Sequence, residues 1–370
     1  MHILYVWSYW QYPQVALEFV ERLSRRGHQV SVLLSNSENV ENIPNQAGID
    51  FHFVPKLDVF SVFTGTPYPV FLGASSYIEA IDPDIVHVNS HLFLTSYQAL
   101  RSSVPLGIPS VLTVHGFAAR RGRVVNALQF VYLRTVAKSI FRRATRVLCL
   151  TEGDAASVAG LIGGFNKVSV VPNGVDTNLF RPSPKKDDNL IAWVGRLVPE
   201  KGLIYLLTAM KEVIAENREA RLVLIGDGIL KDRLIRLSYK LRIRDRVDFL
   251  GKVDRAQVAD ILSKSSVFAF PSIVEGMPFS LLEALACELP VVGSDIQGVR
   301  EVIGDRENGL LIPAGNSKPI SNAILRLLKD AELRRKLGRN GRSSVIKRYS
   351  WDAIVPQVEK VYYEAIADAN

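Results

Sequence analysis

The sequence predicts an α/β protein with two doubly wound, Rossmann-like parallel-sheet domains, and three observations support this. The chain has 370 residues, which is too long for one ordinary core and enough for two domains of typical size. Short, almost continuously apolar runs alternate with helical patterns, as in parallel sheets covered by helices on both faces. This alternation pauses near residue 176 and then begins again.

The first half of the chain is predicted to supply the strands of one sheet. They lie near residues 2–7, 28–34, 50–54, 84–88, 109–114, 145–150 and 168–171. Between them come helical stretches such as 15–26, whose apolar residues are spaced to cover a sheet.

The second half is predicted to supply the other sheet. Its strands are expected near 190–195, 220–225, 246–249, 266–270, 290–293 and 310–312, and its helices near 201–217, 229–241, 255–263, 278–288 and 318–328. Helices with a break near Tyr349-Ser-Trp351 fill 330–370. The junction 176–189 carries Pro182, Pro184 and a charged run, so it is interpreted as a linker.

Composition excludes several classes of protein. A content of 48% hydrophobic and 22% charged residues excludes a mainly disordered chain, a collagen and a disulfide scaffold. Cys149 and Cys287 lie in apolar contexts, which predicts buried, reduced thiols in a cytoplasmic protein. No Cys/His cluster is spaced to hold zinc. The net charge of +8 suits anionic ligands or an anionic membrane surface without selecting one.

Three stretches bear on the membrane. The beginning lacks the basic region and cleavage site of a signal peptide, and the uncharged run 59–78 contains Pro67 and Pro69, which argue against a spanning helix. Residues 85–151 contain no acid and nine bases. Either these bases form a solvated helix face, or they contact anionic lipid or an anionic acceptor. Nucleic acid is disfavoured because no recognition motif accompanies them.

The stretch 270–292 is the most informative. A buried strand ends at Pro271, a loop carries Glu275, and Pro278 stands where a helix can start. The amides near Phe279–Leu282 are expected to face the carboxyl edge of the sheet, which suits phosphate. Glu275 and Glu283 bracket this anion site, and carboxylates suit a ribose diol or sugar hydroxyls.

Two cations follow the first strand of the second domain. Arg196 and Lys201 lie in one loop at the predicted ligand edge of the sheet, where they could neutralise a diphosphate and stabilise it as a leaving group. The alternative is a surface ion pair with Glu200.

Two weaker signals complete the candidate site. Gly226-Asp-Gly228 is a tight turn after a strand, a pattern that by itself often reflects only turn chemistry. His115, in Thr113-Val-His-Gly, follows a strand and can project from the ligand edge. His28 precedes a strand at the opposite edge and is interpreted as structural.

Together these stretches resemble the retaining, nucleotide-sugar-dependent glycosyltransferases of family four, which have the GT-B fold. The resemblance spans nearly the whole chain. It rests on Arg26-Gly-His-Gln-Val, Thr113-Val-His-Gly, Val171-Pro-Asn-Gly-Val-Asp176, Val194-Gly-Arg-Leu…Glu-Lys-Gly202, Gly226-Asp-Gly, Phe249-Leu-Gly251, the E-x7-E spacing of Glu275 and Glu283, and Tyr349-Ser-Trp351.

The resemblance implies the organisation of the site. The acceptor-side domain is 1–176 plus 353–370, the donor-binding domain is 177–352, and the two face each other across a cleft. Arg196 and Lys201 hold the donor diphosphate, Glu283 the ribose, Glu275 lies by the transferred sugar, and His115 contacts the sugar from the other domain. His115, Glu275, Arg196 and Lys201 are thus the expected catalytic residues.

Further contacts are expected around this set. Those to the donor come from Gly226, Gly228, Val253, Gly276, Met277, Phe279, Ser280 and Leu281, and those to the acceptor from Tyr12, Gln14, Arg120 and Arg121. No metal site and no cofactor are expected. The co-substrate is a nucleoside diphosphate sugar, with UDP favoured over GDP.

Two departures from the family pattern stand out. Tyr9-Trp-Gln-Tyr-Pro-Gln14 replaces the usual Gly-Gly pair of the first loop, and Glu275-Gly-Met-Pro-Phe-Ser280 replaces the common Glu-Gly-Phe-Gly.

Three functions remain open at this point. The first is metal-independent transfer of a hexosyl group to an acceptor hydroxyl with retention of configuration. The second is a nucleotide-sugar epimerase of similar two-domain shape, and the third is a catalytically silent nucleotide-sugar-binding protein.

A lipid-linked acceptor and peripheral contact with the cytoplasmic leaflet form a further hypothesis. It rests on the nine bases and on four aromatic residues interpreted as exposed: Phe60, Phe63, Tyr68 and Phe71. The alternative is that these aromatics belong to the core.

Overall fold

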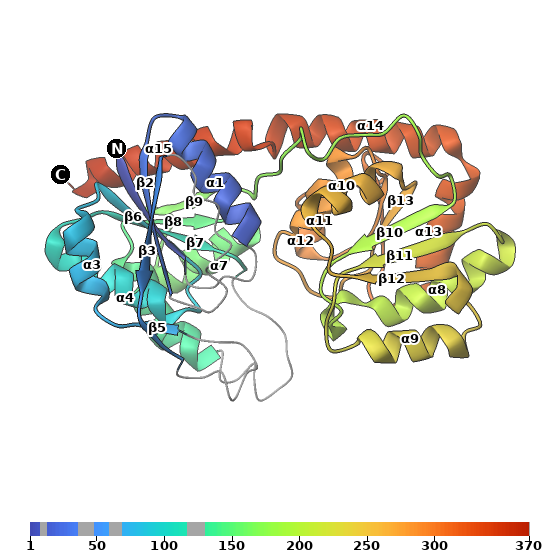
Figure 1. The fold of residues 1–370 in the computed structure, drawn as a ribbon, viewed down its shortest axis with the longest axis horizontal. Helices are drawn as coiled ribbons and strands as arrows, with labels where there is room; N and C mark the ends of the chain where they lie inside the picture. The colour runs from blue at the N-terminus through green and yellow to red at the C-terminus, as the bar shows by residue number, and fades with distance from the viewer. Residues whose placement is uncertain (8–12, 36–47, 59–68, 117–129, 370) are drawn as a thin grey trace. The chain divides into compact units, whose positions relative to one another are not determined.

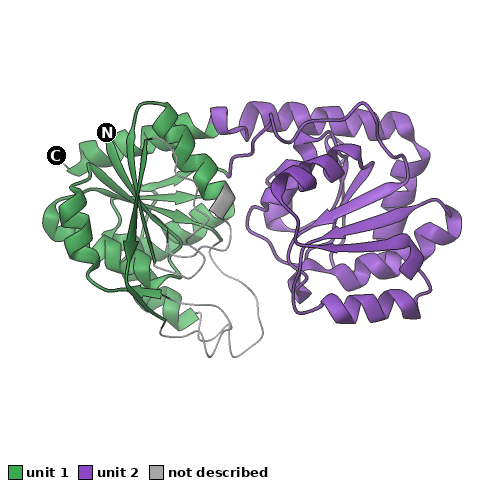
Figure 2. Ribbon diagram, viewed as in Figure 1, with its two compact units in different colours: residues 1–172, 354–370 green, residues 173–353 purple. Residues whose placement is uncertain are grey.

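The computed structural model describes residues 1–7, 13–35, 48–58, 69–116 and 130–369. The chain divides into two compact units (Figure 2): unit 1 is Met1–Pro172 with Ile354–Asn370, and unit 2 is Asn173–Ala353. Each unit contains a parallel sheet with helices, which confirms the predicted fold class.

Unit 1 is built on a sheet whose described strands follow the order β3-β2-β1-β6-β7-β8-β9, all parallel. Because the order reverses between β1 and β6, the carboxyl ends of these two strands form the switch point where such sheets bind ligands. The elements are β1 (His2–Trp7), α1 (Pro13–Arg25), β2 (Gln29–Ser35), β3 (Ile49–Val54), β4 (Lys56–Asp58), β5 (Pro69–Phe71), α3 (Ala74–Ile81), β6 (Ile85–Asn89), α4 (Leu94–Ser103), η2 (Val104–Leu106), β7 (Ser110–Val114), η3 (Leu133–Ala137), α6 (Lys138–Arg143), β8 (Arg146–Cys149), α7 (Glu152–Ile162) and β9 (Val168–Val170).

A small antiparallel pair, β4 and β5, was not expected from the sequence. Phe71 at its end is only 2% exposed and belongs to the core of unit 1. Its interpretation as an exposed aromatic is therefore wrong, because β5 packs on α4 and turns the ring inward. Phe60, Phe63 and Tyr68 lie outside the described residues.

Unit 2 is built on a parallel sheet of order β12-β11-β10-β13-β14-β15. Its switch point lies between β10 and β13. The elements are β10 (Leu190–Val194), η4 (Pro199–Lys201), α8 (Leu203–Glu216), β11 (Arg221–Ile225), α9 (Lys231–Lys240), η5 (Arg244–Arg246), β12 (Val247–Gly251), α10 (Arg255–Lys264), β13 (Val267–Phe270), α11 (Phe279–Ala286), β14 (Val291–Ser294), α12 (Gln297–Arg300), β15 (Gly309–Ile312), α13 (Ser317–Lys329), α14 (Ala331–Arg348) and α15 (Trp351–Ala369), which continues into unit 1.

Helices cover both faces of this sheet (Figure 1). α8 and α9 lie on one face, and α10 and α11 on the other. The strands between them are buried almost throughout, which explains why they are apolar at consecutive positions rather than at alternate ones. α10 begins at a capping box in which Asp254 and Gln257 satisfy each other's backbone N–H groups.

The segment interpreted as a linker is instead bound to unit 2. Val175 donates its amide to the Tyr349 carbonyl at 2.8 Å, and Trp351 donates to the Val175 carbonyl at 3.2 Å. Phe180 is fully buried. The division between the units therefore falls after Pro172 and not after Asp176.

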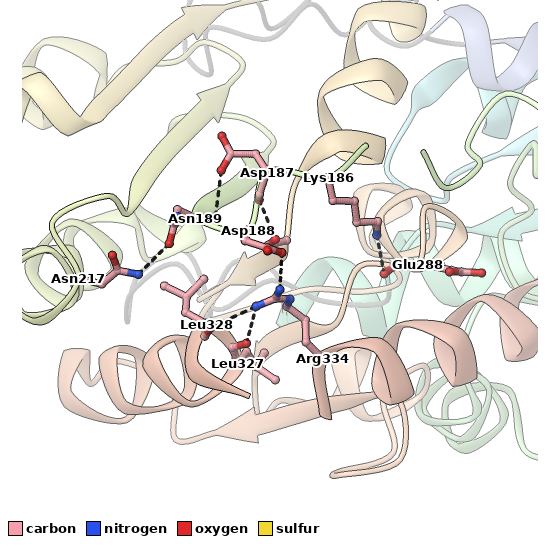
Figure 3. A network of polar contacts seen from close by, with 10 residues as sticks. Lys186, Asp187, Asp188, Asn189, Asn217, Glu288, Leu327, Leu328 and Arg334 are labelled. Carbon is pink, nitrogen blue, oxygen red and sulfur yellow. Dashed lines mark hydrogen bonds and ion pairs between the residues drawn. The ribbon is translucent and has the colours of Figure 1, made fainter. Parts of the chain in front are cut away.

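The charged run of the same segment forms a network with helix ends (Figure 3). Lys186 donates to the carbonyls of Cys287 and Glu288 at 3.1 and 3.0 Å, just beyond the end of α11. Arg334 donates to the last carbonyls of α13 and forms an ion pair with Asp188. Cations suit the negative ends of helices. The charged residues that suggested a linker therefore take part in binding the carbonyl groups at the ends of helices.

The C-terminal part of α15 belongs to unit 1, where polar side chains hold it. Arg26 donates two hydrogen bonds to Glu359, at 2.7 and 2.8 Å, and His28 Nε2 lies 2.9 Å from Glu359 Oε1. Burial opposes ionisation of Glu359, yet the hydrogen bonds from Arg26 and His28 lower the pKa of this carboxyl. The Arg26-Gly-His pattern is thus structural, as predicted for His28.

Both cysteines are buried, free thiols, as predicted. Burial raises the pKa of each thiol to about 12, so neither is a reactive nucleophile near neutral pH.

Candidate active site

The candidate donor site lies at the switch point of unit 2, where loops follow β10, β11 and β13. These loops approach so closely that glycine is required. A Cβ on Gly202 would lie 2.0 Å from the Pro271 carbonyl oxygen, and one on Gly226 would lie 1.9 Å from that of Gly195. Both glycines also have positive φ, of 66° and 129°. The glycines of the motifs therefore allow neighbouring loops to meet at one point.

Lys201 and Glu275 come together at this point. Lys201 ends η4 after β10, Glu275 lies in the loop after β13, and their side chains form an ion pair. They are 14% and 11% exposed. A further hydrogen bond, from the Ile273 amide to the Glu200 carbonyl at 2.8 Å, ties the two loops together. The alternative partner considered for Lys201, Glu200, is not the one the structure shows.

Arg196 is exposed in the same loop as Lys201. Within the described part of the chain, its guanidinium has no hydrogen-bond or ion-pair partner. A charged group of this kind beside the Lys201–Glu275 pair is available to an anionic ligand.

Glu283 lies in α11 and is 8% exposed. Its Oε1 is 3.1 Å from Nη2 of Arg255, the first residue of α10. Arg255 was not among the residues expected from the sequence. The only available signal was its place after a strand end, which does not reveal the carboxylate that it meets.

The other expected donor contacts surround this region. Gly226 and Gly228 follow β11, and Val253 lies half-buried between β12 and α10. Gly276 precedes Met277, which is buried and accepts a hydrogen bond from Asn173 through its carbonyl at 2.8 Å.

The start of α11 carries three of the expected donor contacts. Phe279 and Ser280 form its first turn and are half-buried. Leu281 is fully buried, and its amide donates a hydrogen bond to the Pro278 carbonyl at 3.3 Å. The Leu281 amide, one of those expected at the anion site, thus already has a partner within this turn.

In unit 1, His115 directly follows β7 and is exposed. Its Nε2 lies 3.1 Å from Oδ1 of Asn89, the last residue of β6. Although part of the ring is open to water, desolvation by the surrounding protein lowers the pKa of His115. The neutral imidazole can therefore donate from Nε2 to Asn89, which leaves Nδ1 as an acceptor.

The expected acceptor contacts are not described. Tyr12, Arg120 and Arg121 lie outside the described residues, as does the side chain of Gln14. Among the residues that are described, no group of three or more His, Cys, Asp or Glu side chains could hold a metal ion. Within the same residues, no helix is long and apolar enough to cross a membrane.

Two family models match the chain. Residues 13–179 match "Glycosyltransferase Family 4", and residues 175–344 match "Glycosyl transferases group 1". With the two-sheet architecture, these matches show that the chain belongs to the family 4 type of GT-B glycosyltransferases. Glycosyl transfer is thus its class of activity.

Individual proteins agree with this assignment. An uncharacterised glycosyltransferase of Methanocaldococcus jannaschii is 27% identical over 95% of this chain and 96% of its own. The UDP-Gal:alpha-D-GlcNAc-diphosphoundecaprenol alpha-1,3-galactosyltransferase of Escherichia coli is 29% identical over 77% of this chain and 76% of its own. The structure of HepE from Anabaena in complex with UDP has the same fold, with a TM-score of 0.80, 18% identity and coverage of 98% of this chain and 100% of its own.

Proposed function

We propose that this protein transfers a hexosyl group from a nucleoside diphosphate sugar, UDP rather than GDP, to an acceptor hydroxyl, with retention of configuration and without a metal ion. The observation that carries the proposal is the meeting of Lys201 and Glu275 at the switch point of unit 2, with Arg196 exposed in the same loop. The names of the Escherichia coli relative and of the HepE complex, both of which contain UDP, support the choice of nucleotide.

The proposed chemistry follows from these charges. A donor diphosphate accepts hydrogen bonds from Arg196 and Lys201, which stabilise the negative charge that develops on the leaving group and so take the part of a metal ion. Glu275, now paired with Lys201, then lies beside the transferred sugar and accepts from its hydroxyls. Glu283 accepts from the ribose, and His115 contacts the sugar.

The test is turnover of candidate nucleotide sugars in the presence of EDTA. Thermal shifts first select the nucleotide, and mass spectrometry and NMR then identify the product and its anomeric configuration. A glycoside with the donor's configuration supports the proposal. Conversion of the donor without an acceptor indicates an epimerase, and binding without turnover indicates a silent protein; either result overturns it.

We also propose that the acceptor is lipid-linked and that unit 1 binds reversibly to anionic membranes. Arg134, Lys138, Arg142 and Arg143 line an open cavity of about 480 Å³, here called the basic surface. Arg134 and Arg143 lie over the rings of Phe130 and Tyr97, at 4.3 and 5.8 Å. In the described residues none of the four has an acidic partner.

Apolar side chains accompany the basic surface. Phe130, Val131 and Val136, on the same helical segment, are 55%, 59% and 40% exposed. Cations beside exposed apolar groups suit an anionic bilayer. Arg146, another base of the acid-free stretch, does not take part, because it forms an ion pair with Asp368 at 2.7 Å. The diphosphoundecaprenol in the name of the Escherichia coli relative supports a lipid-linked acceptor.

Co-sedimentation with vesicles tests this second proposal. The protein should bind vesicles that contain phosphatidylglycerol at low salt and be released by high salt, since each base near the surface adds about 1 kcal/mol. Changing Arg134, Lys138 and Arg142 to Glu should abolish binding, whereas changing Arg233 and Arg236 of α9 should not. Binding that ignores lipid charge and salt would leave a soluble acceptor as the better interpretation.

A further inference from the structure

The carboxylate of Glu283 is held by a cation that lies outside the predicted site. Arg255 Nη2 is 3.1 Å from Glu283 Oε1, and the two side chains are 16% and 10% exposed. Charges so shielded from water interact more strongly than a surface pair, and removing one of them is costly to the other.

Arg255 is itself fixed in place. Its guanidinium carbon lies 5.1 Å from the ring centroid of Phe180, which is fully buried. Arg255 is also the first residue of α10, where the positive end of the helix disfavours a cation. Its local position therefore does not explain this charge, whereas its contacts with Glu283 and Phe180 do.

We propose that Arg255 is a positioning residue that orients the carboxylate of Glu283 toward the ribose hydroxyls of the donor. This inference rests on the proposed function. An ionised carboxylate accepts hydrogen bonds and donates none, so its orientation decides how well it meets the two ribose hydroxyls. Without Arg255, the nearly buried carboxylate loses this contact and with it a restraint on its orientation.

The experiment compares two nucleotides that differ only at the ribose. Binding of UDP and of 2′,3′-dideoxyuridine diphosphate is measured by calorimetry on the full chain. Arg255→Met should weaken UDP binding about tenfold, which corresponds to one charge-assisted hydrogen bond of about 1.4 kcal/mol. It should leave the dideoxy nucleotide unchanged, because that ligand has no ribose hydroxyls for Glu283.

Glu283→Gln should show the same selectivity. The double variant Arg255→Met, Glu283→Gln should bind UDP no more weakly than Glu283→Gln alone, since the arginine acts only through the carboxylate.

Arg221→Met is the matched control. Arg221 forms an ion pair with Asp187 at 2.5 Å at the start of β11, the opposite edge of the same sheet. Its loss should leave the binding of both nucleotides unchanged. If Arg255→Met does not fold, Arg255→Lys keeps the charge without the planar fork, and it should weaken UDP alone by a smaller factor.

The outcomes distinguish a failure of this inference from a failure of the proposed function. If wild type binds UDP but the Arg255 variants weaken both nucleotides equally, or neither, the inference is wrong and the proposed function stands. If wild type binds neither UDP nor GDP, the proposed function and this inference both fall.

Discussion

Arg196 and Lys201 differ in how freely each can meet a donor. Arg196 is exposed, whereas Lys201 is already paired with Glu275. Under the proposed function, a donor diphosphate would have to share or displace that pair before both cations could stabilise the leaving group.

We expect Arg196→Ala and Lys201→Ala each to reduce turnover at saturating donor at least a hundredfold, about 2.7 kcal/mol of transition-state stabilisation. Neither residue belongs to the core, so far-UV circular dichroism should remain that of wild type. Lys211→Ala, an exposed lysine of α8, is the control. Near-normal turnover in either active-site variant would contradict the leaving-group role.

The two glutamates are expected to separate binding from chemistry. Glu283 is anchored within α11, whereas Glu275 lies in the loop before it. In the proposed function, Glu283 acts through the ribose and Glu275 through the sugar. Glu283→Ala should therefore raise the KM for the donor about tenfold with a smaller change in kcat. Glu275→Ala should mainly lower kcat. Equal effects of both variants on both constants would count against this division.

At the scale of elements, a buried histidine connects strand β6 to helix α15. His87 is 3% exposed, with Nδ1 2.5 Å from the Tyr362 hydroxyl and Nε2 2.7 Å from that of Thr113. Desolvation by burial, together with the charge of His115, lowers the pKa of His87 to about 3.

The stability of unit 1 should therefore depend on pH through His87. An unfolded histidine has a pKa of about 6.5, so between that pH and about 3 the unfolded chain binds a proton that the folded chain does not. Stability falls as pH decreases through this window, by up to about 1.4 kcal/mol per pH unit. His87→Phe should flatten this dependence of Tm on pH, although it lowers Tm at pH 8. Thr113→Val keeps the histidine and should keep the slope of Tm against pH. Identical slopes in wild type and His87→Phe would exclude His87 as the source of this pH dependence.

At the scale of the whole molecule, unit 1 is completed by the end of the chain. The side chains of Ile354, Val355, Val358, Val361 and Tyr362 are each at most 4% exposed, on a helix whose first three residues belong to unit 2. Unit 1 therefore depends for its core on residues that follow unit 2 in the sequence.

Truncation after Ala353 should destabilise unit 1 and spare unit 2. Each large apolar side chain contributes about 1.5–3 kcal/mol when buried, so the loss of five is comparable to the whole stability of an ordinary domain, about 5–15 kcal/mol. Limited proteolysis should then degrade unit 1 and leave a resistant fragment close to 173–353. Removal of residues 369–370 alone is the control. A truncated protein with an intact unit 1 would show that α15 is dispensable for its folding.

The sequence by itself determined the parallel sheets, because strands buried on both faces must be apolar at nearly every position. It also placed Arg196, Lys201, Glu275 and Glu283 near one sheet edge, because residues that follow parallel strands gather there. It did not determine their pairing. Lys201 with Glu275, Glu283 with Arg255 and His115 with Asn89 join residues from separate loops or strand ends.

Only the tertiary structure decided that the polar segment 176–189 packs on unit 2 rather than forming a linker. Its prolines and charges are typical of a linker, and local composition cannot show that Lys186 and Arg334 reach the ends of helices distant in sequence. The same holds for Phe71, whose burial depends on the packing of β5 against α4. Periodicity reports the environment along one element, whereas these contacts depend on which elements become neighbours in the folded chain.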